Sequence, residues 1–419
     1  MTPDDWTSFR LEPDDVLFFR DGKPSTRGTD HYLRSLFPPY PSTLYGAVRT
    51  RRLLDGGVDL AGLDETSWGR RLNGLSAELG PWGGFGSLRL RGPWLLRGDE
   101  PLLPVPADLG VIPAKATQDA APRIETVVRY RPSSESLPGG GSHPEGLRLL
   151  LPHGTDGDPW KPPAPGVEPR PATGWLLVPA GLAVWRSGGL PAPDHFVHAS
   201  TLWHDETRTG LGLRPKLRIS EDGQLYTFGF VRLLPGVSLG FEVAGSGLKP
   251  EGRLRLGGEG RSVLLAPGPT FPSYSDVKVP PLPWERGFGG EGPGEAGSPG
   301  LRPLLTLTFA TPALSATGAW PPGFSEAQLQ RRIGDVPVRL VGAAVPGSVL
   351  VGGWDLARNQ AKPLRRALPA GSVFLFEPLD GIAAAEAANQ LDGMCLSDFS
   401  GNEGLAQQGF GLVAAGVSW

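Results

Sequence analysis

The segment Leu304-Leu305-Thr306-Leu307-Thr308-Phe309 opens the most regularly patterned part of the sequence. Apolar residues alternate with threonine along it, which predicts a buried strand. Outward from this segment, the pattern predicts strands over 336–345, 348–354, 371–376 and 410–413, and helices over 324–333 and 382–391. Apart from one extra hairpin, the β-α-β-β-α-β order predicts a ferredoxin-like domain over 301–419, which ends in a Gly-rich loop.

Residues 1–266 fit the same order. Strands are predicted over 15–19, 87–91 and 226–234, and helices from Pro41 onward and over 175–185. Ser42 is the expected N-cap of the first helix, with Leu44, Gly46, Ala47 and Val48 as its sheet-facing stripe. The predicted fold class is therefore α+β, with two tandem ferredoxin-like (RRM-like, βαββαβ) domains and long Pro/Gly-rich loop insertions.

Two segments are unusually rich in proline and glycine. Residues 131–172 contain 10 Pro and 7 Gly, and residues 267–300 contain 8 of each. Such densities disfavour helices and central strands. We therefore expect a loop insertion at about 131–172 within an N-terminal domain of residues 1–266, and an interdomain linker over 267–300. The 12 Trp and 17 Phe of the chain argue for a folded core rather than disorder.

Composition excludes several classes of protein. The formal net charge is −3, whereas a free-standing nucleic-acid binder usually has a basic excess, so any nucleic-acid contact must be local. The single cysteine, Cys395, excludes a disulfide framework and a cysteine-based zinc cluster. The acidic N-terminus lacks the apolar segment of a signal peptide, and no apolar run is long enough to span a membrane. A cytoplasmic protein without membrane contact is expected.

Charge is distributed unevenly along the chain. Residues 16–54 contain seven basic and two acidic residues, and residues 356–372 contain four basic residues and no acid. Residues 377–403 contain six acids and no base. We interpret the two basic stretches as RNA contacts. The acidic stretch is expected to face solvent or a protein neighbour.

Several segments, taken in order, resemble one family. They are LFFRDGKP (17–24), PPYPSTLYGAVR (38–49), LLPVPAD (102–108), LGGEGR (256–261), GWDLAR (353–358), KPLRRALPAGS (362–372) and QGFGL (408–412). This series is similar to the family of the third subunit of the Cmr complex, the type III-B CRISPR RNA-guided effector, in the RAMP superfamily.

The resemblance implies a non-catalytic subunit of an antiviral ribonucleoprotein. It would hold the 5′ tag of the crRNA and pair with the large polymerase-like Cmr subunit and a backbone Cmr subunit, with target RNA contacted indirectly. No cofactor, metal or enzymatic activity is expected. Three alternatives stay open: the equivalent type III-A subunit, a metal-independent RAMP endoribonuclease that processes crRNA, and a carbohydrate- or small-molecule-binding module suggested by the Trp count.

The predicted RNA-binding residues combine cations that reach phosphates, aromatic rings that stack on bases, and a glycine loop whose backbone N–H groups face the RNA. They are Phe19, Arg20, Lys23, Arg34, Arg49, Arg52, Arg89, Arg358, Lys362, Arg365, Arg366, Gly409, Phe410 and Gly411. The loop 409–416 has no Arg or Lys, so only its N–H groups and Phe410 could contact RNA.

Structural interpretations compete with several of these assignments. Phe18 and Phe19 suit a core as well as a stacking site, and the cluster 80–86 suits a structural turn. Trp354 is expected in the core, because it lies at a strand end. The histidines 195, 198 and 204 match no metal site, and His31 lacks a nameable partner for acid–base catalysis. No helix follows 409–416, which excludes a dinucleotide-binding loop.

Overall fold

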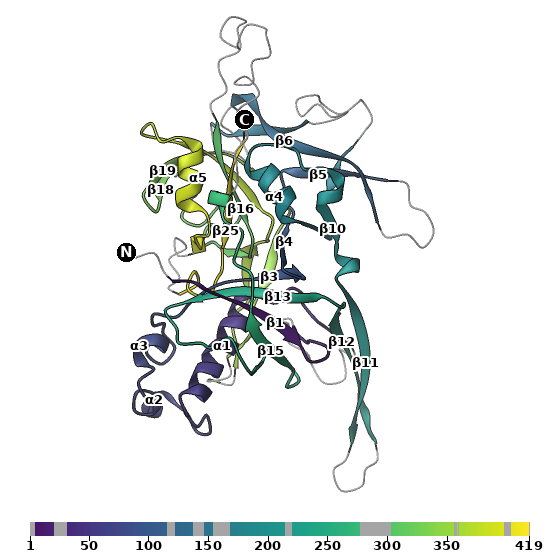
Figure 1. Ribbon diagram of the computed structural model, residues 1–419, viewed down its shortest axis with the longest axis vertical. Helices are drawn as coiled ribbons and strands as arrows, with labels where there is room; N and C mark the ends of the chain where they lie inside the picture. The colour runs from purple at the N-terminus through teal and green to yellow at the C-terminus, as the bar shows by residue number, and fades with distance from the viewer. Residues whose placement is uncertain are drawn as a thin grey trace, which may run out of the picture.

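The computed structural model describes residues 5–20, 32–114, 122–136, 146–153, 168–213, 220–276, 303–355, 358, 360–397 and 404–418. Within them, the chain is a mixed α+β protein with far more strand than helix, which confirms the predicted class (Figure 1). Its helices are α1 (Pro41–Asp55), α2 (Glu65–Arg71), α3 (Ser76–Leu79), α4 (Pro179–Arg186) and α5 (Ala384–Leu391). Short 3-10 turns lie at Pro193–His195, Ala199–Thr201 and Tyr274–Asp276.

An eight-stranded sheet forms the N-terminal half, in the order β10-β9-β4-β3-β13-β1-β15-β14. Its strands are β1 (Thr7–Pro13), β3 (Arg89–Arg97), β4 (Glu100–Pro104), β9 (Trp175–Leu177), β10 (Phe196–His198), β13 (Val237–Ala244), β14 (Arg253–Arg255) and β15 (Ser262–Pro267). β1 lies antiparallel between β13 and β15, and Phe9 stacks on its cross-strand partner Phe241 with the ring centroids 5.1 Å apart. The helix α1 packs beside β3 and β14.

A five-stranded antiparallel sheet forms the C-terminal half, in the order β18-β19-β24-β16-β25. Its strands are β16 (Leu304–Phe309), β18 (Gln330–Ile333), β19 (Val336–Ala344), β24 (Val373–Pro378) and β25 (Val413–Ser418). Every residue of β16 and β25 is buried, so both faces of the sheet are covered. The helix α5 covers one face, where Ala387, Ala388 and Leu391 join the core.

Smaller sheets surround these two. One has the order β7-β6-β5-β8, a second β11-β12-β2, a third β17-β23-β20, and β21 pairs with β22. Their strands are β2 (Tyr32–Arg34), β5 (Leu109–Pro113), β6 (Ile124–Ser136), β7 (Arg148–His153), β8 (Arg170–Pro171), β11 (Trp203–Leu213), β12 (Ser220–Leu233), β17 (Ala313–Leu314), β20 (Val349–Val351), β21 (Trp354–Asp355), β22 (Gln360–Ala361) and β23 (Arg365–Leu368). The long β11–β12 hairpin projects from the body of the molecule (Figure 1).

The helix α1 begins where the sequence predicted, although its cap differs. Tyr40 is the N-cap and Pro41 occupies the first helical position, where its fixed φ suits the helix. Ser42 is therefore not the cap. Leu44 and Val48 face the core as expected, whereas Gly46 is exposed.

Other predicted elements need correction. Residues 324–333 contain no helix, because 330–333 form the edge strand β18. The opening strand is residues 7–13 rather than 15–19, and the final strand begins at Val413. The segment 175–185 contains β9 before α4 begins at Pro179. The described parts of 131–172 include strands of the β7-β6-β5-β8 sheet, so this insertion is not only a loop.

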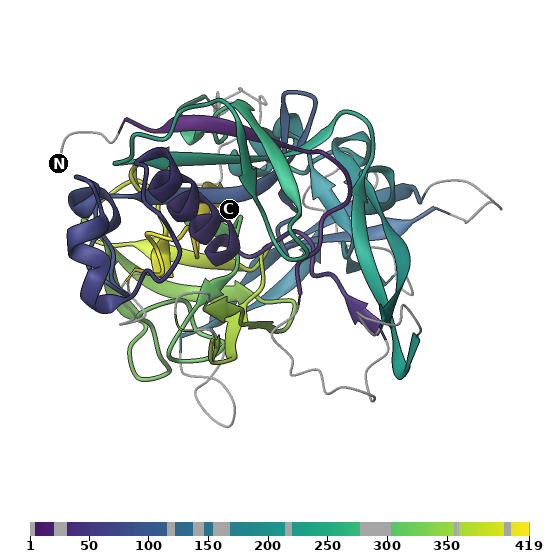
Figure 2. The ribbon, with the colours of Figure 1, turned by 90° about the horizontal axis from the view of Figure 1, so that it is seen from below.

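The two predicted domains share one apolar cluster. It joins Trp94 and Leu96 of the N-terminal sheet to Val373 and Leu375 of the C-terminal sheet, with Trp185 of α4 between them. Figure 2 shows the C-terminal segments, in yellow, beside α1–α3. Residues 277–300, most of the predicted linker, lie outside the described residues. The first part of that segment is packed, since Phe271 is buried in the shared cluster.

Candidate nucleic-acid interface

The arginines near the end of α1 contact other parts of the N-terminal half. Arg52 donates two hydrogen bonds to the Glu78 carboxylate, at 2.6 and 3.0 Å, and these raise the pKa of Arg52. Arg51 donates to the Asp55 carboxylate at 2.7 Å. Whether Arg52 also binds RNA stays a prediction, but its side chain holds α1 against α3.

Arg49 connects α1 to the glycine-rich loop 80–86. Its guanidinium donates to the carbonyl oxygens of Leu79 and Gly84, both at 3.0 Å, and lies 5.6 Å from the ring centroid of Trp68. Burial lowers the pKa of Arg49. Trp68 in turn donates from Nε1 to the Gly80 carbonyl at 2.9 Å. The loop thus offers carbonyl oxygens to a cation, in agreement with a structural turn rather than a phosphate cradle.

The second basic stretch lies on an exposed surface formed by two short strand pairs, β20–β23 and β21–β22. We name it the basic–aromatic surface; its residues are Leu350, Trp354, Arg358, Lys362, Leu364, Arg365 and Arg366, all exposed. Leu350 is in register with Arg366, and Trp354 with Ala361. Trp354 is 52% exposed, so the expectation that it belongs to the core is wrong.

Positive charge dominates the basic–aromatic surface. Residues 349–368 contain four cations and one carboxylate, a formal balance of +3 on a chain of −3. The carboxylate, Asp355, lies 3.3 Å from the Arg358 guanidinium across the β21–β22 turn. Such a local excess attracts polyanions.

The basic–aromatic surface adjoins the N-terminal half. The Tyr40 hydroxyl donates to the Leu350 carbonyl at 2.8 Å, and the Arg358 guanidinium lies against Gly83. Lys362 is exposed as a residue, but its ammonium lies in a crowded part of the surface. Burial lowers the pKa of Lys362, Asp355 opposes this, and the charge of Arg49 lowers the pKa further. Lys362 of the C-terminal half therefore lies within electrostatic range of Arg49 of the N-terminal half.

The loop 409–411 is engaged inside the protein. The N–H groups of Gly409, Phe410 and Gly411 donate to the carbonyls of Ala406, Leu405 and Pro312 at 2.9–3.1 Å. Phe410 is 1% exposed and packs in a cluster with Leu314 and Val351. The groups that were expected to contact RNA are therefore used for packing, because the final strand needs this turn to enter the sheet.

The remaining predicted residues are dispersed. Phe19 is buried and stacks on Phe37 at 6.2 Å, in agreement with the core interpretation. Arg20 is exposed, and Arg34 on β2 lies 3.4 Å from the Asp205 carboxylate of β11. Arg89 is half-buried at the start of β3. Lys23 and His31 lie outside the described residues.

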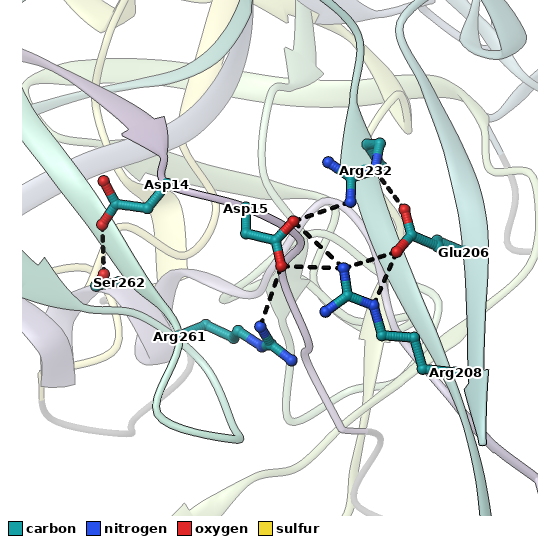
Figure 3. A network of polar contacts seen from close by, with 7 residues as sticks. All are labelled: Asp14, Asp15, Glu206, Arg208, Arg232, Arg261 and Ser262. Carbon is teal, nitrogen blue, oxygen red and sulfur yellow. Dashed lines mark hydrogen bonds and ion pairs between the residues drawn. The ribbon is translucent and has the colours of Figure 1, made fainter. Parts of the chain in front are cut away.

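Sequence reasoning missed an ion-pair network at the base of the β11–β12 hairpin (Figure 3). Asp15 accepts from Arg232 at 2.9 Å and from Arg261 at 3.3 Å, and lies 3.0 Å from Arg208. Glu206 pairs with both Arg208 and Arg232. Hydrogen bonds from these two arginines hold the pKa of Glu206 at about 2. The only signal was a small group of charged residues on β11, Asp205, Glu206 and Arg208, and the partners Asp15 and Arg232 lie far away in the sequence.

Other charged residues form buried pairs. Arg129 donates from Nε to Asp108 at 2.8 Å, with both side chains inaccessible to solvent. Arg186 pairs with Asp392 at 2.7 Å, also in the interior. Asp392 belongs to the acidic stretch that was expected to face solvent or a neighbour, so that interpretation is wrong for this residue. It accepts hydrogen bonds from the N–H groups of Tyr274 and Ala415, at 2.7 and 2.8 Å, which places it at the junction of three segments.

The residues that the structure describes contain no group of three or more His, Cys, Asp or Glu side chains placed to hold a metal ion. His198 packs edge-on against the Trp175 ring, and His195 accepts a hydrogen bond from the Ala192 N–H. Within the same residues, the helices are all too short or too polar to cross a membrane.

Comparison with known proteins gives one family. The model of the CRISPR-associated protein family Cas_Cmr3 matches residues 9–418. No curated protein matches the chain. Similar solved structures are type III-B Cmr-β bound to cognate target RNA and AMPPnP (13% identity, 88% of this chain and 86% of the other, TM-score 0.44) and the same complex with target RNA alone (14%, 88% and 86%, 0.43). A type III-A Csm3–Csm4 subcomplex is also similar (10%, 89% and 93%, 0.31).

Proposed function

This chain belongs to the Cas_Cmr3 family of CRISPR-associated proteins, as its sequence motifs predicted, and from that premise we propose that it is a non-catalytic, guide-RNA-binding subunit of a type III-B effector ribonucleoprotein. In this role it holds the 5′ tag of the crRNA, contacts the large polymerase-like subunit and a backbone subunit, and meets target RNA only indirectly. It acts as one subunit of a Cmr complex in antiviral defence.

The observation that carries the proposal is the basic–aromatic surface. An overall acidic chain places Arg358, Lys362 and Arg366 on one exposed region, and Arg49 of the other half is near enough to lower the pKa of Lys362. Single-stranded RNA is bound by this combination of phosphate-facing cations and exposed rings. The arginines of α1 contribute less directly, because their hydrogen bonds go to the protein itself.

The strand orders support a tandem ferredoxin-like origin for the two halves. In the N-terminal sheet, β3-β13-β1-β15 has the second, third, first and fourth strands of a βαββαβ unit side by side. In the C-terminal sheet, β19-β24-β16-β25 repeats that order. The proposal is that each half is a ferredoxin-like unit that has lost one helix: α1 remains in the first and α5 in the second.

The test neutralises two cations of the surface, with Lys362→Gln and Arg366→Gln together. The variant should assemble with the other subunits but retain less guide RNA, and the loss should be largest at low salt and shrink as salt rises, because wild type has more salt-sensitive phosphate contacts to lose. For single strands, each lost phosphate contact makes the negative slope of log K against log salt shallower by about 0.7, so the slope of the double variant should be shallower than that of wild type by about 1.4. The matched control is Arg253→Gln with Arg255→Gln, two exposed arginines of β14. Equal RNA retention by both double variants would exclude this surface.

A further inference from the structure

Trp354 is exposed to solvent, unlike the buried tryptophans of the described residues. Trp94 and Trp185 are in the core, at 2% and 0% exposure, and Trp68 of α2 is 7% exposed. Trp354 has more than half of its surface in solvent, on a strand of only two residues. An exposed tryptophan ring loses the hydrophobic stabilisation that its size would give in a core, which leaves a large flat apolar group available to a binding partner.

From this position we propose that Trp354 is a base-stacking residue: its indole stacks on an unpaired base of the RNA, while Arg358, Lys362 and Arg366 contact the phosphates on either side. This assignment deepens the proposed function and rests on it, because it names which group of the RNA the surface reads. Stacking tolerates any base, since every base has a π-face.

The strand pairing places several cations on the same short segments as Trp354. Trp354 pairs with Ala361 on β22, so Lys362 is one residue beyond its cross-strand partner, and the Lys362 N–H donates to the Gly353 carbonyl at 2.9 Å. Arg358 lies in the turn between the two strands, beside Asp355. Trp354, Arg358 and Lys362 thus lie on one short strand pair and in the turn that joins it.

Charge decides between RNA and a protein partner. Protein interfaces are enriched in Trp and Arg alike, so the arginines alone do not distinguish the two kinds of partner, and the net charge has to. Four cations and a single carboxylate occupy residues 349–368, and that carboxylate is paired with Arg358, which leaves a net positive charge around Trp354. A polyanion with flat apolar groups matches this surface, and single-stranded RNA is such a polyanion.

The experiment measures binding of the full chain to a short fluorescein-labelled oligouridylate and to the same oligonucleotide with abasic positions, across a salt series. Trp354→Ala should weaken binding to the oligouridylate by roughly tenfold and leave the salt slope unchanged, because no charge is lost. On the abasic RNA, wild type and Trp354→Ala should bind equally. Trp354→Phe should keep most of the affinity, whereas Trp354→Leu, which retains apolar area but no ring, should behave like Trp354→Ala. Leu149→Ala, at a residue of β7 that is also 52% exposed but lies outside the basic–aromatic surface, is the control for general loss of apolar surface and should bind as wild type does.

The outcomes separate this inference from the proposed function. If Lys362→Gln with Arg366→Gln lowers the salt slope while Trp354→Ala binds normally, the surface binds phosphates and the stacking assignment is wrong. If neither variant changes RNA binding, both the stacking assignment and the proposed RNA-binding surface are wrong. If Trp354→Ala leaves RNA affinity intact but prevents co-purification with the other subunits, the ring is a protein anchor and the inference is overturned.

Discussion

Asp108 is the residue whose replacement should cost this protein the most stability. Its carboxylate accepts from Arg129 Nε at 2.8 Å through one oxygen and from Trp185 Nε1 at 2.8 Å through the other. Asn at this position has nearly the same volume but only one oxygen. Whichever way the amide turns, its NH2 group faces an N–H donor, either the guanidinium or the indole.

The magnitude follows from the charges that remain. Arg129 would be buried without a counter-ion, and breaking one partner of such a pair typically destabilises by about 3–5 kcal/mol. Arg131 is buried beside it: burial and the charge of Arg129 lower the pKa of Arg131 to about 9, and Asp108 acts in the opposite direction. Without Asp108, two buried cations would repel each other, so we expect the upper part of that range. The free energy of unfolding of natural domains is about 5–15 kcal/mol in total, so such a loss would be severe.

The assay is urea denaturation of the full chain at neutral pH, followed by tryptophan fluorescence and by circular dichroism, whose agreement tests for a single transition. The matched control is Asp205→Asn, the same chemical change in an exposed pair with Arg34 at 3.4 Å, which should cost less than about 1 kcal/mol. Asp108→Leu combined with Arg129→Met should be less destabilising than Asp108→Asn alone, because it removes both charges. Comparable small losses for Asp108→Asn and the control would refute the reasoning.

Two further predictions concern the turn before β25 and the hairpin base. Gly409→Ala should destabilise the fold by about 1–3 kcal/mol in urea denaturation, because φ is +96° and a Cβ would lie 2.9 Å from the Gly92 carbonyl oxygen. Gly46→Ala, in open space on α1, is the control and should stabilise the fold by about 0.5–1 kcal/mol. A Gly46→Ala variant less stable than Gly409→Ala would contradict this reasoning. Glu206 has its pKa lowered to about 2 when folded, below its unfolded value, so its stabilising contribution is complete above about pH 5 and falls as the pH drops toward 2. The difference in unfolding free energy between wild type and Glu206→Gln should therefore shrink on acidification, and a difference that grows would be inconsistent with the network.

The sequence predicted elements well where the pattern was long and local. Residues 304–309 and the start of α1 were placed correctly, because alternation and a proline at the helix start act within a few residues. The opening strand 7–13 was missed although Phe9 and Leu11 alternate with polar neighbours; the more apolar run at 16–19 outweighed them. Residues 324–333 have helix-forming composition, but pairing with β19 draws 330–333 into the sheet.

The candidate site was predicted only in part, because the position of an arginine in the sequence does not indicate which groups its side chain contacts in the fold. Lys362 and Arg366, predicted to contact RNA, are exposed, and their contact with RNA stays a prediction. Arg52 has the same local context, yet its partner Glu78 lies 26 residues away and makes it a structural residue. Trp354 was assigned to the core on general frequency alone, and nothing nearby in the sequence indicates that its strand is an exposed pair of two residues.

The two halves share an apolar core, so they cannot be treated as separate bodies. The described residues between β16 and β19 contain no helix, and those between β13 and β15 contain only β14. A sheet that lacks a covering helix must bury its apolar face elsewhere, and here Val373 and Leu375 of the C-terminal sheet pack with Trp94 and Trp185. The basic–aromatic surface is formed at the boundary of the halves, where Tyr40 contacts Leu350 and Gly83 contacts Arg358. A substitution that loosens the shared core should therefore weaken RNA binding without touching any residue of the surface, which is why stability must be measured beside affinity for every variant.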